Sequence, residues 1–168
     1  PRYLKLFEVV PGPKCTQEIT DFLMMYGDKF LGKTSVLAKD TPAFIGNRIG
    51  IFGIMSLFHV VKEMGLTIEE VDKLTGPVIG RPKSATFRTI DVVGLDTIVH
   101  CYSVMLAGIP ERFIEISPAR PSAMLVDANR LGQKNGLGYY GYQNDERGRA
   151  AKAPDPLVIQ AFEEQFGT

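Results

Sequence analysis

The stretch TPAFIGNRIGIFGIMSLFHVVKEM, residues 41–64, decides the fold class of this chain. Thr41 can cap a helix that has Pro42 in its first turn, and Gly65 is placed to end it after Met64. Apolar side chains occur on nearly every side of this predicted helix. Because such a helix has to be covered on all sides, it belongs at the centre of a helical bundle or in an interface.

The residues after this helix predict further helices and almost no strand. Thr67 and Glu70 have the spacing of a capping box, which indicates a short helix ending near Leu74. Further helices are expected at residues 86–91, 95–107, 122–131 and 155–166. The pair Tyr139-Tyr140 is the one strand candidate in this part of the chain. The sequence therefore predicts a mainly α fold from residue 41 onward.

The first forty residues have a different pattern. A strand is expected over Tyr3–Val10, a helix capped by Thr16 over Gln17–Leu31, and a short strand at Ser35–Ala38. The apolar residues of that helix recur at helical spacing: Ile19, Phe22, Leu23, Tyr26 and Phe30. Residues 1–40 thus predict a β-α-β unit, residues 41–143 a helical domain, and residues 144–168 a charged linker with a terminal helix.

Composition excludes several classes of function. The 168 residues hold 19 Lys and Arg against 19 Asp and Glu, so the basic excess of a nucleic-acid binder is missing. The apolar run at residues 49–58 is too short to span a bilayer. Cys15 and Cys101 are far apart and are expected to be reduced thiols, and His59 and His100 lack the clustering of metal ligands. We therefore expect no metal site, no transmembrane segment and no nucleic-acid partner.

Glu8 is the first residue that departs from a purely structural pattern. Period two places it in one row with Leu4, Leu6 and Val10, and a carboxylate in an apolar row is costly unless it is paired or hydrogen-bonded. Two interpretations stay open. Glu8 either sees water on an edge strand, or it is a buried carboxylate that orients a partner such as a histidine.

Asn47 is the second such residue, because it lies in the first turns of the most apolar helix. Its amide either bonds locally to the loop before Pro42 or points at the carbonyl of a ligand. Gly46, Gly50 and Gly53 fall near one face of the same helix, where each glycine costs about 1 kcal/mol. This cost favours close backbone approach, more often by another helix than by a ligand.

The glycine-rich stretch Gly132–Gly138 looks superficially like a phosphate-binding loop. It lacks the preceding strand and the following helix that such a loop needs. We therefore interpret it as a turn that carries the aromatic side chains of Tyr139 and Tyr140 into the core.

Four blocks of sequence resemble the L-3-hydroxyacyl-CoA dehydrogenases of fatty-acid β-oxidation. They are Leu6-Phe7-Glu8-Val9-Val10, Lys39-Asp40-Thr41-Pro42-Ala43-Phe44-Ile45-Gly46-Asn47-Arg48, Asp91-Val92-Val93-Gly94-Leu95-Asp96-Thr97 and Gly132-Gln133-Lys134-Asn135-Gly136-Leu137-Gly138-Tyr139-Tyr140. The last block, with the charged tract after it, is most similar to the multifunctional β-oxidation proteins. Where the family commonly has Pro-Met-Gly-Pro-Phe, this chain has Pro82-Lys83-Ser84-Ala85-Thr86-Phe87.

The resemblance implies a helical C-terminal dehydrogenase domain preceded by the last β-α-β of an NAD-binding Rossmann domain. It maps a catalytic glutamate, which orients the family's catalytic histidine, onto Glu8, and an asparagine near the reacting carbon and the nicotinamide onto Asn47. That histidine, in a His-x-Phe-Asn-Pro motif, would lie just ahead of Pro1. Since the histidine and the glycine-rich nucleotide fingerprint are not in this sequence, we expect the isolated chain to be inactive.

Two functions follow from these observations. In the first, the chain is part of an enzyme that uses NAD to oxidise 3-hydroxyacyl-CoA to 3-ketoacyl-CoA, with acyl-CoA as the substrate of the whole protein. In the second, it is a helical module for dimerisation or domain packing, as a homodimer or against a second helical domain. The resemblance implies a cytoplasmic location for a bacterial protein and a mitochondrial or peroxisomal one for a eukaryotic protein.

Overall fold

The computed structural model describes residues 4–108, 119–144 and 150–166. The chain divides into two compact units, Pro1–Gly50 and Ile51–Thr168.

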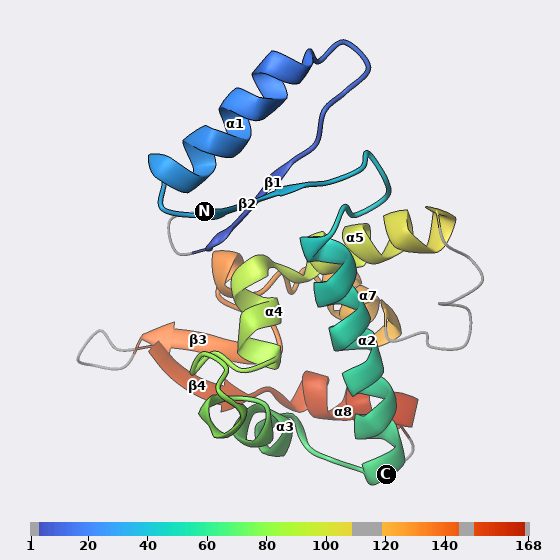
Figure 1. Ribbon diagram of the computed structural model, residues 1–168. Helices are drawn as coiled ribbons and strands as arrows, with labels where there is room; N and C mark the ends of the chain where they lie inside the picture. Colours follow the sequence, from blue (N-terminus) through green and yellow to red (C-terminus); the bar gives the residue numbers. More distant parts are fainter. Residues whose placement is uncertain (1–3, 109–118, 145–149, 167–168) are drawn as a thin grey trace. The chain divides into compact units, whose positions relative to one another are not determined.

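The first unit is a strand–helix–strand arrangement, as the sequence predicts. Strand β1 (Leu6–Val9) pairs in parallel with β2 (Thr34–Leu37), and Leu6 is opposite Thr34 in the register. Helix α1 (Gln17–Lys29) connects the two strands (Figure 1), and the Thr16 side chain caps it by accepting the Ile19 N–H at 3.4 Å. The β-α-β prediction for this part of the chain is confirmed.

Helix α1 turns a different face to the strands than its apolar pattern suggests. Its buried residues are Thr20 and Gly27, and a Cβ atom at Gly27 would overlap the Ser35 hydroxyl and lie 2.6 Å from the Phe7 ring. The apolar residues at helical spacing are largely exposed, among them Ile19, Phe22, Tyr26 and Phe30. The rings of Phe22, Tyr26 and Phe30 stack in succession, with centroids 5.9 and 5.5 Å apart. Gly27 therefore makes the close contact between α1 and the strands, and the aromatic side chains of α1 are exposed.

The second unit is helical with one β-hairpin (Figure 1). Its elements are the continuation of α2 (Gly46–Met64), α3 (Ile68–Leu74), η1 (Pro77–Ile79), α4 (Phe87–Val93), α5 (Leu95–Gly108), α7 (Ala119–Asp127), η2 (Gln133–Asn135), β3 (Tyr140–Asn144), β4 (Ala150–Pro154) and α8 (Pro156–Phe166). The capping box of Thr67 and Glu70 is formed at the start of α3, as predicted. The mainly α fold class is confirmed.

Three predicted elements differ from the structure. Helix α2 begins at Gly46 rather than Pro42, because Ala43 and Phe44 adopt φ angles of 62° and 48°, outside the helical region. The helix expected at residues 122–131 ends at Asp127, after which Asn129 is left-handed with φ 56°. The described part of the expected linker forms β3 and β4, which pair antiparallel with Asn144 opposite Ala150.

The expectation that α2 is covered all round is met on one face only. Ile51, Met55, Phe58 and Val61 are buried, whereas other apolar side chains of the helix are exposed in the described structure. These exposed residues are Ile49, Phe52, Val60 and Met64. Helix α2 therefore buries one apolar face, and a second apolar face is left exposed by the residues that the structure describes.

The core of the second unit is built around aromatic rings. Phe58 of α2 meets Phe87 of α4 edge to face at 5.5 Å, and Phe87 lies 4.8 Å from the Tyr139 ring. Tyr139 and Tyr140 are both fully buried, and the Tyr139 hydroxyl shares a 2.8 Å hydrogen bond with Ser122. The glycine-rich connection thus carries aromatic anchors into the core, as predicted.

A buried carboxylate, Asp91 near the end of α4, organises that connection. It accepts the backbone N–H groups of Tyr139 and Tyr140 at 2.8 and 3.0 Å and the Tyr142 hydroxyl at 2.7 Å. A Cβ atom at Gly138 would overlap the carboxylate. Gly138 is therefore required for close approach to Asp91 rather than for binding phosphate.

A second buried carboxylate, Asp72 of α3, caps the start of α4. It accepts the backbone N–H groups of Thr86 and Phe87 at 3.1 and 2.7 Å and the Tyr140 hydroxyl at 2.9 Å. The Arg88 guanidinium lies 3.7 Å from Asp72 and 5.3 Å from the centre of the Tyr140 ring. Tyr140 thus connects the two carboxylates, through its backbone to Asp91 and through its hydroxyl to Asp72.

No single helix among residues 4–108, 119–144 and 150–166 is long and apolar enough to cross a membrane. Helices α4 and α5 reach the required length and hydropathy only as a pair, and that pair is bent by 92°.

Candidate functional site

The two residues that the sequence singles out meet in the first unit, where Glu8 of β1 contacts the start of α2. Glu8 is partly buried at the third position of β1. Its two carboxylate oxygens each accept a backbone N–H group: Oε2 that of Ile45 at 2.8 Å and Oε1 that of Gly46 at 3.0 Å. Asn47 is the next residue along the helix. The structure therefore brings Glu8 and the segment that carries Asn47 together.

The two hydrogen bonds to Glu8 compensate for the lack of an acidic residue in the first turn of α2. The first turn of α2 has no acidic residue, although the N–H groups at a helix start are unpaired and the helix dipole favours negative charge there. Glu8 supplies both the acceptors and the charge from a strand 38 residues earlier in the chain. The edge-strand interpretation, in which Glu8 simply faces water, is therefore not what the structure shows.

The turn before α2 is held in an uncommon conformation. Ala43 and Phe44 are consecutive left-handed residues, a conformation that costs about 1–2 kcal/mol for a residue with a Cβ atom. The Phe44 N–H donates to the Thr41 carbonyl at 3.0 Å, and the Arg48 N–H donates to the Ala43 carbonyl at 3.2 Å. Strained backbone of this kind persists where surrounding contacts fix it.

Asn47 is exposed, and its side-chain amide makes no hydrogen bond to another residue that the structure describes. The local bond to the loop before Pro42, one of the two interpretations of this residue, is thus not made there. Helix α2 fixes the direction of the Asn47 side chain, and the exposed amide stays available for a hydrogen bond to a ligand. Both properties suit a group that contacts a ligand.

The glycines of α2 have separate explanations. A Cβ atom at Gly46 would lie 2.8 Å from Glu8 Oε1, so this glycine gives the carboxylate room. Nothing lies within 4 Å of a Cβ built at Gly50 or Gly53. Among the residues that the structure describes, the expected close approach of another helix is therefore not made at these two positions.

The described residues contain no group of three or more His, Cys, Asp or Glu side chains that could hold a metal ion. His59 lies 3.3 Å from Glu63 one turn along α2, and both side chains are exposed. Cys15 and Cys101 are free thiols, as expected.

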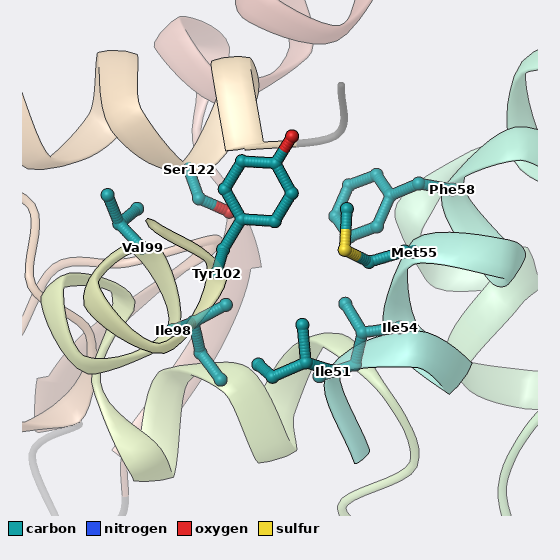
Figure 2. Close-up of a pocket in the computed structure, with 8 residues that line it drawn as sticks. All are labelled: Ile51, Ile54, Met55, Phe58, Ile98, Val99, Tyr102 and Ser122. Carbon is teal, nitrogen blue, oxygen red and sulfur yellow. The ribbon is translucent and has the colours of Figure 1, made fainter. Parts of the chain in front are cut away.

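An apolar pocket opens in the second unit between α2 and α5 (Figure 2). In the figure, the side chains that α2 contributes face those of α5, and Ser122 of α7 lies beside Tyr102. The lining residues are Ile51, Ile54, Met55, Phe58, Ile98, Val99, Tyr102 and Ser122. The volume is about 10 Å³, which is at most the space of one water molecule. In this form the pocket is a packing gap and not a ligand site.

The ionisable groups whose pKa values are raised belong to the core of the second unit. Burial raises the pKa of Asp91, against the opposing effect of its hydrogen bonds from Tyr139, Tyr142 and Tyr140. Burial also raises the pKa of the Tyr140 and Tyr142 hydroxyls, and the nearby carboxylates add to this effect. These groups hold the fold together, and sequence patterns did not identify Asp72 or Asp91 as members of a network.

The chain thus combines a parallel strand–helix–strand unit with a helical unit, and a carboxylate of β1 binds the start of α2. Residues 44–142 match the family model for the 3-hydroxyacyl-CoA dehydrogenase C-terminal domain. The chain belongs to this family, and the resemblance drawn from the sequence is confirmed.

Named relatives agree with this assignment. A probable 3-hydroxyacyl-CoA dehydrogenase of Bacillus subtilis is 41% identical over 160 residues, which are 94% of this chain and 20% of the relative. The fatty acid oxidation complex subunit alpha of Idiomarina loihiensis is 35% identical over 94% of this chain and 21% of its own length. The chain thus spans about a fifth of each of these two relatives.

A solved structure has the same fold. The (S)-3-hydroxybutyryl-CoA dehydrogenase PaaH1 of Ralstonia eutropha matches with a TM-score of 0.72 and 26% identity. The match covers 84% of this chain and 49% of that chain. The helical domain of this family therefore accounts for the architecture described above.

Proposed function

We propose that this chain is the C-terminal portion of an NAD-dependent L-3-hydroxyacyl-CoA dehydrogenase of fatty-acid β-oxidation, which oxidises 3-hydroxyacyl-CoA to 3-ketoacyl-CoA. The observation that supports the proposal is that Glu8 of β1 binds the start of the helix that carries Asn47, in a chain of this family. The names of the relatives, a dehydrogenase and a fatty acid oxidation subunit, support the substrate class.

Residues 1–40 do not by themselves fit NAD. The pyrophosphate of a dinucleotide is held by a glycine-rich turn between a strand and a helix. The connection between β1 and α1 reads VPGPKCT at residues 10–16 and contains a single glycine. The nucleotide would therefore be held by a domain outside this chain.

Glu8 is proposed to orient a catalytic histidine. Oxidation of a hydroxyl group requires a base that removes its proton, and the resemblance assigns this base to a histidine ahead of Pro1. Each oxygen of a carboxylate can accept two hydrogen bonds, and each Glu8 oxygen is engaged by one backbone N–H group. Glu8 therefore retains the capacity to accept an imidazole N–H and to stabilise the imidazolium that forms when the base takes the proton.

Asn47 is proposed to contact the reacting end of the substrate. Its exposed amide can donate to the oxygen that changes from hydroxyl to carbonyl during the oxidation. The rigid helix start keeps this donor in one place, which reduces the reorganisation needed during reaction.

The test compares this chain alone with the same chain joined to a nucleotide-binding domain ahead of Pro1. With acetoacetyl-CoA and NADH, we expect loss of NADH absorbance for the joined protein and none for the 168-residue chain. Asn47→Ala should abolish most of this activity, whereas Lys62→Ala, an exposed change on the same helix, should not. Turnover by the chain alone, or equal activity of the two variants, would contradict the proposal.

A second candidate function is that of a dimerisation or packing module. The exposed apolar side chains of Phe52, Val60 and Met64 on α2 favour it, because such a face is normally covered. Its occupant is either a second copy of the chain or a second helical domain. Sedimentation should then show self-association that Phe52→Asp removes. A chain that is monomeric at every concentration would exclude the homodimer.

The wider setting follows from the same proposal. Acyl-CoA is the substrate of the whole protein, which we place among the multifunctional β-oxidation proteins. The two curated relatives described above are bacterial, which supports the cytoplasmic alternative over the mitochondrial or peroxisomal one.

A further inference from the structure

Arg48 makes two contacts with the turn that precedes α2. Its guanidinium reaches back from the helix and donates through Nη2 to the Pro42 carbonyl at 3.1 Å. Its backbone N–H donates to the Ala43 carbonyl at 3.2 Å. Arg48, a residue of α2, thus binds the carbonyls of Pro42 and Ala43 in the first half of the turn.

Glu8 holds the second half of the same turn, through the N–H groups of Ile45 and Gly46. Ala43 and Phe44, both left-handed, lie between the Pro42 carbonyl, which Arg48 binds, and the Ile45 N–H, which Glu8 binds. A turn in such a conformation relaxes toward ordinary backbone angles when its contacts are removed. Because Asn47 follows directly after the turn, relaxation would change where its amide points.

We propose that Arg48 is a positioning residue, which keeps the turn closed and thereby holds Asn47 and the Glu8 carboxylate in their working geometry. The inference rests on the proposed function, since it assigns Arg48 a part in the same reaction. Arg48 is not itself a catalytic residue, because its guanidinium is directed at the backbone of the turn and acts through its neighbours.

The contact of Arg48 can be removed with little effect on overall stability. Its Nε atom is shielded from solvent and has no hydrogen-bond partner among the described residues. Replacing the side chain by methionine keeps most of the aliphatic stem and removes a buried donor that is unsatisfied there. Lysine in its place retains one donor group that can reach a carbonyl. Arg48→Met and Arg48→Lys therefore form a matched pair.

The first measurement is amide hydrogen exchange on the 168-residue chain, and it needs no activity. We expect Arg48→Met to speed exchange at Ile45 and Gly46 about tenfold, the size expected for the loss of one hydrogen bond. The Ala38 N–H, bonded to the Val9 carbonyl at 2.9 Å, serves as an internal control that should not change. Arg48→Lys should stay near the original rates. Unchanged exchange in Arg48→Met, or equal effects of both substitutions, would overturn the inference.

The second measurement uses the chain joined to its nucleotide-binding domain. We expect Arg48→Met to lower kcat about tenfold while KM for acetoacetyl-CoA stays within about twofold, and Arg48→Lys to restore kcat. Faster exchange with an unchanged kcat would overturn this inference and leave the proposed function standing. A joined protein that is inactive before any substitution would overturn the proposed function, and this inference with it.

Discussion

The hydroxyl of Tyr142 donates to Oδ2 of Asp91 at 2.7 Å and joins strand β3 to the end of α4. Asp91 is fully buried, and the described residues place no cation next to its carboxylate. Its charge is instead stabilised by three N–H and O–H donors of residues 139–142. The connection between α7 and the hairpin is therefore held by a buried charge without an ion pair.

Tyr142→Phe should destabilise the second unit in a pH-dependent way. The hydrogen bond lowers the pKa of Asp91, which burial raises, so its removal raises that pKa further. A carboxyl whose pKa is higher in the folded state loses stabilisation as pH rises from the unfolded value, 3.8, through the folded value. The cost of the substitution should therefore grow from pH 4 to pH 7 and reach about 1.5–3 kcal/mol. Urea unfolding at both values measures it, with Tyr26→Phe on the exposed face of α1 as the control.

Gly138→Ala should be strongly destabilising, by more than about 3 kcal/mol, because its Cβ atom would overlap the Asp91 carboxylate. Gly53→Ala is the matched substitution, since its Cβ atom would meet nothing within 4 Å. It should stabilise helix α2 by about 0.5–1 kcal/mol through helix propensity. Thermal unfolding of the two variants gives opposite shifts if this view is correct, and two losses of similar size would contradict it.

In the first unit, Gly27→Ala should disturb the packing of α1 on the strands, whereas Phe30→Glu should not. The new methyl group at Gly27 would overlap Ser35, while Phe30 is 68% exposed. We expect amide exchange in β2 to rise for the first variant and the second to change stability by less than about 0.5 kcal/mol. A large destabilisation by Phe30→Glu would show that the stacked aromatic face of α1 is covered in solution.

Glu8→Gln in the joined protein should lower turnover far more than it changes NAD affinity. Glutamine keeps one acceptor for the start of α2 but loses the charge that would stabilise an imidazolium. Glu69→Gln, an exposed substitution in the first turn of α3, is the control. Steady-state kinetics with varied NAD separates the two effects, and equal losses in turnover and affinity would indicate that Glu8 is only structural.

Much of the fold could be predicted from local patterns. The periods of 2 and 3.6 residues identified the β-α-β unit and most helices, and Glu8 stood out as a carboxylate in an apolar row. Its partners could not be predicted, because the N–H groups of Ile45 and Gly46 belong to another element. The same holds for Asp72 and Asp91, whose partners lie up to 68 residues away.

The errors have equally physical reasons. Strand β4 reads AAKAP and has no β-branched or aromatic residue, so only its pairing with β3 makes it a strand. The late start of α2 depends on left-handed angles at Ala43 and Phe44, which neither residue type favours on its own.

The long sequence separation between Glu8 and the start of α2 also bears on the order of folding. Most helix starts are completed by a neighbouring residue, so they can form as soon as the first turn does. Here the acceptors lie 37 and 38 residues upstream of the N–H groups that they bind. Contacts of such high sequence separation require the closure of a long loop, and this closure costs chain entropy before the contact contributes stability. We therefore expect the body of α2 to form early and its first turn, which carries Asn47, to be among the last parts to become ordered.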